Sequence, residues 1–321
     1  MNTSVIIPTY RRPQDLARCL QVLTQQVNLP TEVIVVIRDQ DVDTWAMLET
    51  LKSLSLPLKP VTVTVPGVIA AMNAGVAAAT GDFIAFTDDD AAPHPDWLQR
   101  IEAHFLADDR IGGVGGRDAI QRSEPWFHGE RAIVGLLQWH GRLIGEHHRG
   151  IGAAREVDVL KGVNMSFRRQ VFDDLRFDER LRGTGAQVHF EVVFCLTLRR
   201  KGWKLIYDPA ILVDHYIAQR FDEDQREQFN RVAFANAVHN ETLALLEHLS
   251  LWQRLFFMLW VVVVGTLQAP GFVQWIRLLP GEGSISTQKW LASMQGRWQG
   301  WQTWRQSQTD RASLRITTHS P

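Results

Sequence analysis

The first part of the chain alternates short runs rich in β-branched residues with amphipathic stretches, and no other feature constrains the fold as strongly. Strands are expected at residues 4–8, 32–37, 61–65 and 83–87, with helices between them at 13–26, 41–54 and 68–79. Strands and helices that alternate at this spacing build a parallel sheet covered by helices. The sequence therefore predicts an α/β fold with an open, mostly parallel sheet.

A change of composition near residue 220 divides the chain. Residues 222–228 are strongly charged, and a helical pattern follows over 230–249. The length of 321 residues also suits one sizeable α/β domain with a smaller appendage. We expect a catalytic domain over residues 1–220 and an apolar, helical C-terminal region over 221–321.

Composition excludes some functions. The formal net charge is −1 at pH 7, so the excess of positive charge typical of nucleic-acid-binding proteins is missing. Cys19 and Cys195 lie far apart and outside any Cys/His cluster, which argues against a disulfide framework or a zinc site. The first residues lack a basic segment followed by a long apolar run, because Pro8 interrupts them. We expect a cytoplasmic protein without a nucleic-acid partner.

Three consecutive aspartates, Asp88, Asp89 and Asp90, directly follow the expected strand at 83–87. Ligands of an open parallel sheet bind at the carboxyl ends of its strands. Three adjacent like charges cost free energy unless a cation shares them, and Mg²⁺ or Mn²⁺ prefers carboxylate oxygen and can bridge to a diphosphate. The run alone fits either a metal site or a solvated acidic loop.

The segments around this run resemble family 2 glycosyltransferases with the GT-A fold. The matching segments are, in order, residues 5–12 (VIIPTYRR), 32–37 (EVIVVI), 67–75, 80–90 (TGDFIAFTDDD) and 162–169 (GVNMSFRR), with His215 after them. Each segment is a weak signal, but the ordered set spans about two thirds of the chain. The resemblance implies a GT-A sheet whose fourth strand ends in a DXD-type motif, and an enzyme that uses a nucleoside-diphosphate sugar.

The resemblance also implies the donor contacts. Family members contact a phosphate through an arginine at the position where this chain has Met72. Arg11 or Arg12 would supply that contact here. Asp39, or Asp41 after it, would accept a hydrogen bond from the base, with uridine favoured. The expected donor-binding residues are Pro8, Thr9, Tyr10, Arg11, Asp39, Asn73, Asp88 and Asp89.

The metal ligands implied by the resemblance are Asp90 and His215, because many members place a histidine near the metal. Neutral imidazole suits Mn²⁺ better than Mg²⁺, although a purely structural histidine is the alternative. Asp88 would lie on the sugar or ribose side of the donor. Asp89, between the two, is the aspartate most compatible with a structural role.

The catalytic base of the family belongs to a Glu-Asp pair at the start of a helix. Counting back from Lys201 and Gly202, the Asp position falls on Glu191. A carboxylate there could take the proton of an acceptor hydroxyl while a metal stabilises the leaving diphosphate. His189 is the alternative base. Glu191 could instead serve only to stabilise the N-terminus of the helix through the helix dipole.

Processive members carry a Gln-x-x-Arg-Trp motif beyond the base, and no such run follows Glu191. We therefore expect an inverting transfer of a single sugar. A nucleotidyltransferase is a second hypothesis, but it should show a glycine-rich basic loop where this chain has residues 8–11 (PTYR). A membrane-bound scaffold with a degenerate site is a third, and the intact Asp88, Asp90 and Glu191 weigh against it.

Residues 255–267 are almost purely apolar, but they fall short of the roughly 20 residues that span a bilayer as a helix. Tryptophans and arginines elsewhere in the C-terminal region favour a membrane–water interface, whereas a core helix is the alternative. We expect this region to attach the enzyme to the cytoplasmic face of the membrane. The acceptor would then be lipid-linked, a glycolipid or a growing envelope polysaccharide.

Overall fold

The structure is a computed structural model that describes residues 2–51, 53–121, 129–225 and 228–317, with side chains as far as residue 310. The chain divides into two compact units. The first comprises residues 1–138, 143–177 and 194–221, and the second 139–142, 178–193 and 222–321. The second unit thus takes in two earlier segments besides the C-terminal region.

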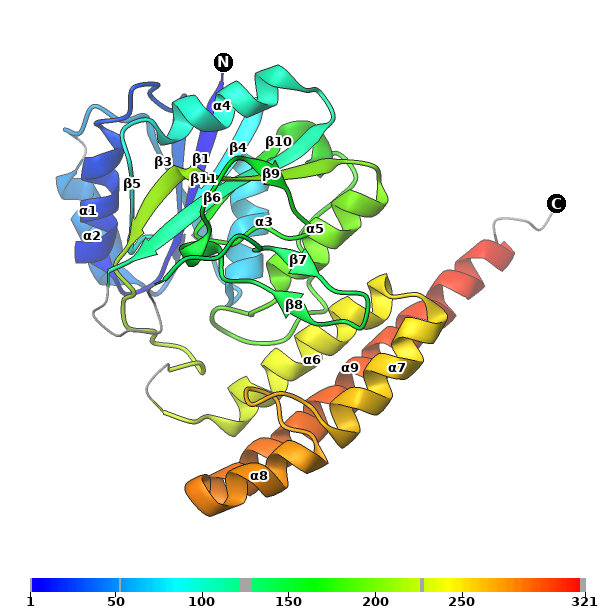
Figure 1. Ribbon diagram of the computed structural model, residues 1–321. Helices are drawn as coiled ribbons and strands as arrows, with labels where there is room; N and C mark the ends of the chain where they lie inside the picture. Colours follow the sequence, from blue (N-terminus) through cyan, green and yellow to red (C-terminus); the bar gives the residue numbers. More distant parts are fainter. Residues whose placement is uncertain (1, 52, 122–128, 226–227, 318–321) are drawn as a thin grey trace. The chain divides into compact units, whose positions relative to one another are not determined.

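Within the described residues, the first unit forms a nine-stranded sheet flanked by helices (Figure 1). The strands are β1 (Thr3–Thr9), β2 (Glu32–Arg38), β3 (Leu58–Val63), β4 (Phe83–Thr87), β5 (Ala91–Pro93), β6 (Ile111–Ile120), β9 (Arg155–Glu156), β10 (Asn164–Arg168) and β11 (Lys204–His215). They follow the order β3-β2-β1-β4-β10-β6-β11-β5, and β9 pairs with β11. Strands β1 to β4 are parallel, as are β6 and β11, whereas β10 and β5 run antiparallel to their neighbours.

Helices cover this sheet. They are α1 (Pro13–Leu23), α2 (Val42–Thr50), α3 (Val68–Ala78), α4 (Trp97–Ala107) and the later part of α5 (Phe190–Arg200). Proline opens α1, where its fixed φ suits the first helical position. The apolar spacing of α1 then buries Leu16, Cys19, Leu20 and Leu23. The central strands β1, β2 and β4 are almost entirely buried, as a parallel sheet covered by helices requires.

Two strands extend further than their local patterns indicate. The sequence predicts strands at 111–116 and 204–207, but β6 continues to Ile120 and β11 to His215. Their parallel register shifts between Asp208 and Leu212. A Cβ atom at Gly116 would lie 1.9 Å from the carbonyl oxygen of Ile211, so only glycine permits this close approach. The shift lets β11 carry His215 to the end of the sheet.

The second unit is helical. It contains α6 (Arg231–His248), α7 (Leu251–Val263), α8 (Phe272–Glu282) and α9 (Ser284–Thr317), together with the first turn of α5. Asn230 caps α6 by accepting from the amides of Val232 and Ala233. Helix α9 packs on α6, and a Cβ atom at Gly296 would lie 2.5 Å from the carbonyl oxygen of Ala235. A small residue is therefore needed where these helices touch.

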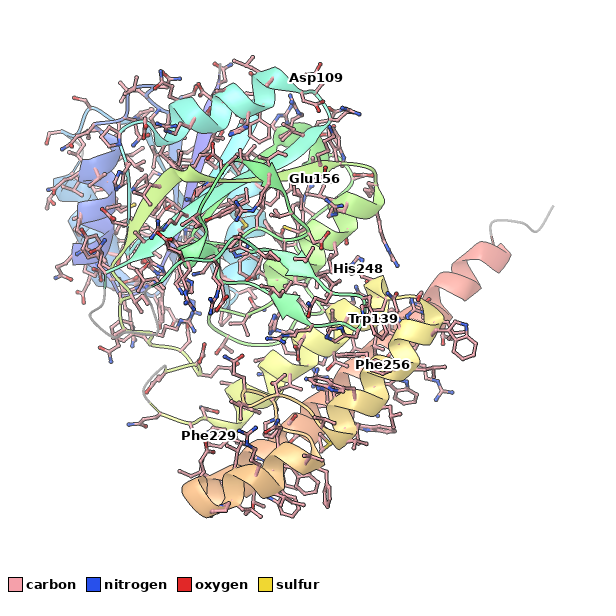
Figure 2. All side chains as sticks on the ribbon, viewed as in Figure 1. Asp109, Trp139, Glu156, Phe229, His248 and Phe256 are labelled. Carbon is pink, nitrogen blue, oxygen red and sulfur yellow. The ribbon has the colours of Figure 1, made fainter. Side chains whose placement is uncertain are left out.

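Apolar side chains are exposed on two helices of the second unit. Large exposed examples are Leu251, Trp252, Leu255, Phe256, Leu259, Val262 and Val263 on α7, and Phe272, Val273 and Ile276 on α8. Trp139, from the short segment 139–142, packs on Phe256 with ring centroids 5.2 Å apart (Figure 2). Across the described residues, no helix has both the length and the apolar character needed to cross a membrane.

Candidate active site

The three aspartates lie in the turn between β4 and β5. Asp89 and Asp90 are buried, and Asp88 is partly buried. In the sheet, His215 at the end of β11 stands opposite Ala91 at the start of β5. The backbone amide of Tyr216 donates to the carbonyl oxygen of Asp90 over 2.9 Å. Pairing between β5 and β11 therefore brings His215 to the aspartates.

Asp88, Asp90 and His215 form a group that could hold a metal ion. One ligand atom from each lies within 4.8 Å of the others, and His215 Nε2 lies 3.4 Å from Asp90 Oδ1. In the described part of the chain, Asp90 Oδ1 and both ring nitrogens of His215 are buried without a hydrogen bond. Carboxylate oxygen with imidazole nitrogen is a donor set that suits Mn²⁺. The residues present therefore fit a divalent cation.

Arg12 shares the charge of the aspartate run. Its Nη2 lies 2.8 Å from Asp89 Oδ1, and its Nη1 lies 3.2 Å from Asp90 Oδ2. Burial opposes its charge, but Asp89 and Asp90 raise the pKa of this guanidinium above its usual value. The protein itself therefore offsets part of the free-energy cost of placing three carboxylates next to one another. The family resemblance implied only a phosphate contact, from Arg11 or Arg12.

The site shifts the pKa values of the three aspartates differently. Burial, and next to it the charge of Asp90, raises the pKa of Asp88. Burial outweighs the Arg12 charge at Asp89 and raises its pKa to about 7. At Asp90 burial acts in the same direction, but His215 and Arg12 overcome it and hold its pKa well below the usual range. Asp90 is therefore the most firmly ionised of the three.

Asp118 and Lys161 also belong to this cluster, and neither was among the residues predicted from the sequence. Asp118 is fully buried, forms an ion pair with Lys161, and places Oδ2 3.5 Å from His215 Nδ1. Burial would raise the pKa of Asp118, but Lys161 and His215 lower it to about 2. Burial likewise opposes the charge of His215, yet Asp118 and Asp90 raise its pKa to about 9. Without a metal, the two carboxylates favour the protonated form of His215.

A sequence signal for Asp118 did exist. It lies two residues after the glycine-rich end of the expected strand, and β6 pairs in parallel with β11, placing Asp118 opposite Val213. Neighbouring parallel strands end at the same edge of a sheet. Asp118, two residues past its expected strand, and His215, at the end of the parallel neighbour β11, are therefore candidates for contact once the pairing is known.

The expected base-binding region comprises the loops after β1 and β2. The Arg38 guanidinium lies 4.0 Å from the centre of the Tyr10 ring, and Asp39 is exposed directly after β2. Asp41 is buried instead, where it accepts from the Arg11 amide over 2.5 Å and caps α2. Of the two candidate acids, Asp39 is therefore the accessible one. Arg11 has φ of +57°, a conformation uncommon outside glycine.

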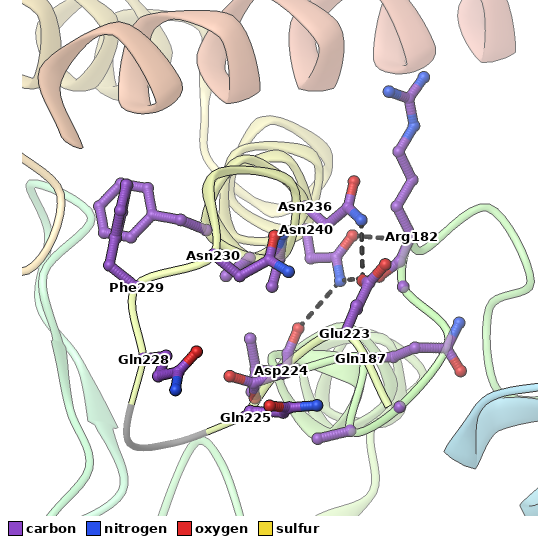
Figure 3. A pocket seen from close by; sticks show the side chains of 17 residues that line it. Arg182, Gln187, Glu223, Asp224, Gln225, Gln228, Phe229, Asn230, Asn236 and Asn240 are labelled. Atoms are coloured by element: carbon purple, nitrogen blue, oxygen red, sulfur yellow. Dashed lines mark hydrogen bonds between the residues drawn. The ribbon is translucent and has the colours of Figure 1, made fainter. Parts of the chain in front are cut away.

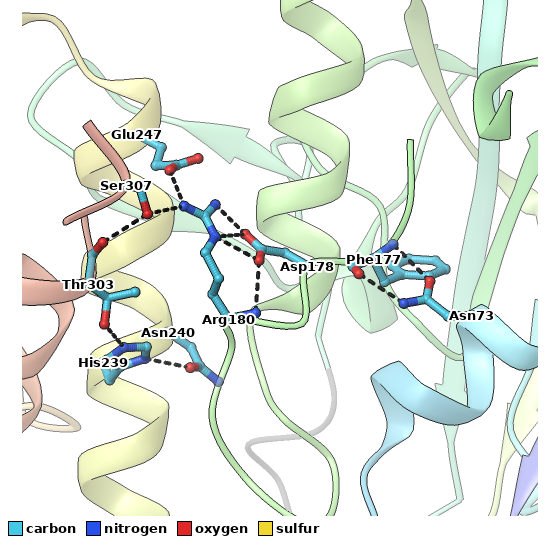
Figure 4. A network of polar contacts seen from close by, with 9 residues as sticks. All are labelled: Asn73, Phe177, Asp178, Arg180, His239, Asn240, Glu247, Thr303 and Ser307. Atoms are coloured by element: carbon cyan, nitrogen blue, oxygen red, sulfur yellow. Dashed lines mark hydrogen bonds and ion pairs between the residues drawn. The ribbon is translucent and has the colours of Figure 1, made fainter. Parts of the chain in front are cut away.

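Other predicted residues are placed as follows. Thr9 ends β1 and is buried, and Pro8 before it is partly buried. The Asn73 amide on α3 exchanges two hydrogen bonds of 3.0 Å with the backbone of Phe177 (Figure 4), so it anchors that segment. Glu191 is the second residue of α5 and belongs to the second unit. Its pairing with the aspartates across a donor stays a prediction.

Comparison with known proteins decides the family. A family model described as glycosyl transferase family 2 matches residues 4–176, more than half of the chain. The chain belongs to glycosyl transferase family 2. This family 2 glycosyltransferase is 24% identical over 225 residues to the glucosyl-dolichyl phosphate glucuronosyltransferase of Haloferax volcanii, covering 67% of this chain and 69% of that one. The family predicted from the sequence is confirmed.

Solved structures similar to this glycosyltransferase agree with the predicted fold. One is S. aureus TarS 1-349 in complex with UDP-GlcNAc, with a TM-score of 0.59, 17% identity and coverage of 91% of this chain and 79% of that one. Another is the mannosyltransferase PcManGT from Pyrobaculum calidifontis in complex with GDP-Man and Mn²⁺, with a TM-score of 0.56, 15% identity and coverage of 93% and 86%. The predicted GT-A fold class is confirmed.

Proposed function

We propose that this glycosyltransferase moves a single sugar, with inversion, from a nucleoside-diphosphate sugar to an acceptor hydroxyl. The grouping of Asp88, Asp90 and His215 at the edge of the sheet carries the proposal. The two similar structures hold UDP-GlcNAc and GDP-Man, and one of them holds Mn²⁺, which supports a nucleotide-sugar donor and a divalent ion. Uridine remains the favoured nucleoside of the donor.

Asp90 and His215 are the proposed metal ligands. The Oδ2 atom of Asp90 already accepts from Arg12 and, over 2.9 Å, from the amide of Ala218. These contacts orient the carboxylate and direct Oδ1 toward His215. A bound Mn²⁺ or Mg²⁺ would stabilise the negative charge of the leaving diphosphate.

The remaining proposed donor contacts come from the end of β1, from the loops that follow β1, β2 and β4, and from α3. Asp39 is proposed to accept from the base, and Asp88 to bind the sugar or ribose. Asp89, held by Arg12, would act by fixing this turn. The proposed donor site also contains Pro8, Thr9, Tyr10, Arg11 and Asn73.

Glu191 is the proposed general base. Its place in the first turn of α5 favours the ionised carboxylate, because the helix dipole is positive at that end. An ionised carboxylate can accept the proton of the acceptor hydroxyl as the new glycosidic bond forms. The proton is therefore held at a Glu191 carboxylate oxygen after transfer.

The donor site is tested by calorimetric titration of the full chain with UDP, GDP, ADP and CDP, each with and without Mn²⁺. We expect one nucleoside diphosphate to bind in the presence of Mn²⁺ and to bind much more weakly without it. If none of the four binds in either condition, the proposed donor site is wrong.

We further propose that α7 and α8 attach the enzyme to a membrane surface, at its cytoplasmic face, and that the acceptor belongs to lipid-linked, glycolipid or envelope polysaccharide synthesis. Both helices expose large apolar side chains. Residues 251–281 also contain Arg254 and Arg277 but no acidic residue, a composition that suits an anionic lipid surface.

Vesicle flotation tests the attachment. The full chain should float with phosphatidylglycerol vesicles, and a Leu255→Glu, Leu259→Glu double variant should not, because both side chains are exposed on α7. Val27→Glu, at an exposed position of the first unit, is the control and should float like the unchanged chain. Failure of the unchanged chain to float would contradict the proposal.

A further inference from the structure

A cavity of about 280 Å³ opens within the second unit (Figure 3). Its first wall comes from residues 182–183 and 185–188, which precede α5. Its second wall comes from residues 223–225 and 228–230, which precede α6. The N-terminal half of α6 closes it between them. This volume is close to the lower limit of about 300 Å³ for small-molecule sites, so it suits one small ligand.

Asn240 fixes the first wall. This fully buried side chain on α6 donates through Nδ2 to the carbonyl oxygens of Arg182, over 2.9 Å, and Val188, over 3.1 Å. Its Oδ1 accepts from the Arg182 amide over 2.8 Å. Both ends of the segment are therefore tied to the same helix by one amide group.

A polar network holds the chain just before this wall. Arg180 pairs with Asp178, and its Nη1 donates to Glu247 of α6 over 2.8 Å and to Ser307 of α9 over 2.7 Å (Figure 4). The wall therefore starts from a segment that is bonded to both long helices of the second unit. A wall fixed before binding reduces the entropy that a ligand must overcome.

The second wall packs closely on the first. Glu223 Oε1 accepts from Asn236 Nδ2 of α6 over 2.9 Å. A Cβ atom at Gly185 would lie 2.9 Å from Asp222 Cβ, and Gly183 has φ of +125°. These two glycines allow the segments to approach, because a side chain at either position would strain or separate them.

The lining combines carboxamides with aromatic rings. Gln225, Gln228 and Asn230 surround the open space in Figure 3, and carboxamides both donate to and accept from hydroxyl groups. Phe229 and Phe234 pack edge to face with ring centroids 5.5 Å apart. Aromatic faces of this kind bury the apolar face of a ligand.

The charges of the lining disfavour an anionic ligand. The described lining residues include one cation, Arg182, and two acids, Glu223 and Asp224. A diphosphate would meet net repulsion at this short range. A neutral ligand with many hydroxyl groups and one apolar face fits better, and a saccharide has both.

The first wall leads directly into the proposed catalytic base. Val188 at its end lies three residues before Glu191. Gln187 and His189 have φ of +40° and +74°. Non-glycine residues rarely adopt such values, and the residues that do are concentrated at functional sites. The segment that lines the cavity is thus the same segment that presents Glu191.

We propose that this cavity binds the acceptor as a neutral saccharide. Phe229 packs against the apolar face of one sugar ring, and the carboxamides of Gln225 and Gln228 bind its hydroxyl groups. The identity of the ligand as the acceptor rests on the proposed transferase function. The proposal that the cavity binds a saccharide does not depend on that function.

Saturation-transfer NMR on the full chain tests the cavity, with the methyl glycosides of glucose, galactose, mannose and N-acetylglucosamine as probes. We expect saturation of the ring protons of at least one glycoside. Phe229→Ala should weaken its binding about tenfold, the loss expected from one aromatic contact, and Gln228→Ala should also weaken it. Val232→Ala, at an exposed position of α6 outside the cavity, should bind like the unchanged chain.

Two results would overturn the proposal. One is no binding of any of the four glycosides at millimolar concentration. The other is equal binding by the Phe229→Ala variant and the unchanged chain. Inorganic pyrophosphate is a further probe, and competition by it for the bound glycoside would contradict a site for neutral ligands.

Parallel titrations with nucleoside diphosphates and Mn²⁺ separate the two proposals. Glycoside binding lost at Phe229→Ala, with nucleotide binding unchanged in that variant, supports both. Nucleotide binding without glycoside binding overturns the cavity proposal and leaves the transferase proposal in place. Glycoside binding without nucleotide binding in the unchanged chain overturns the acceptor role.

Discussion

Nη2 of Arg12 lies 2.8 Å from Oδ1 of Asp89, whose side chain is fully buried. Because a guanidinium keeps its proton at any physiological pH, this cation is always present beside the aspartate run. The turn that carries the proposed metal ligand is therefore supported by an ion pair that needs no metal. Arg12 connects the loop after β1 to the turn after β4.

Removing Arg12 should destabilise the protein. Arg12→Ala removes the cation from both Asp89 and the firmly ionised Asp90, and breaking a buried ion pair in this way costs about 3–5 kcal/mol. The free energy of unfolding from urea titration should fall by roughly this amount. Arg100→Ala, which removes an exposed pair with Asp96, should cost less than about 1 kcal/mol. Equal effects of the two variants would show that Arg12 does not support the site.

Asp118 should tune metal binding without being a ligand. Its carboxylate lies 3.5 Å from His215 Nδ1, where it can orient the ring, and loss of such a partner costs about 10–100-fold in metal affinity. Asp118→Asn should therefore weaken Mn²⁺ binding, measured by the paramagnetic resonance signal of free Mn²⁺. Asp90→Asn should weaken it further. An Asp118→Asn variant with unchanged affinity would remove Asp118 from the site.

Glu191→Gln should separate chemistry from donor binding. Loss of a general base costs about 10²–10⁴-fold in rate, whereas the isosteric amide preserves the shape of the first turn of α5. Turnover should fall by this factor, and the nucleoside-diphosphate dissociation constant should stay within about twofold. Glu156→Gln, at an exposed position, is the control and should leave turnover unchanged. Equal losses of turnover and nucleotide binding in Glu191→Gln would indicate a structural role.

Glu32 should give the protein an acid-sensitive share of its stability. Burial would raise the pKa of Glu32, but hydrogen bonds from Ser4 and Thr80, with Lys59 nearby, lower it from 4.5 to about 2. A lowered pKa stabilises the folded state above pH 4.5, and this contribution is lost as pH falls from 4.5 toward 2. The contribution at pH 7 is about 3 kcal/mol.

The measurement is urea unfolding of the unchanged chain and Glu32→Gln between pH 3 and 7. The variant should be less stable at pH 7, and the difference between the two proteins should shrink as pH falls below 4.5. Glu156→Gln serves again as the exposed control, with a small difference at every pH. A difference for Glu32→Gln that stays constant across this range would exclude the linkage.

The parallel half of the sheet was predictable because its signals are local. The runs of β1, β2 and β4 are continuous, apolar and β-branched, so each was placed within two residues of its observed bounds. Strand β3 begins three residues earlier than expected. It lies at the edge of the sheet, where Pro60 is tolerated and where half-burial gives a weaker pattern.

The ends of β6 and β11 were not predictable from local pattern. Asp118 and His215 lie where β6 and β11 continue past charged residues and Pro209, and these two continuations pair with each other. The same holds for the cavity of the second unit. Its two walls precede different helices, and the buried Asn240 joins only the first of them to α6.

The α/β alternation and the position of three carboxylates at the end of β4 could be predicted from the sequence alone, because each depends on residues close together in the chain. The family could be predicted because several short motifs follow one another in a fixed order. Tertiary structure decided which groups surround those carboxylates. Arg12 and His215 reach Asp90 from distant segments, and Asp118 reaches His215. These contacts depend on strand order, on register and on the gap that Gly116 leaves for Ile211, which are fixed by the burial of the whole sheet.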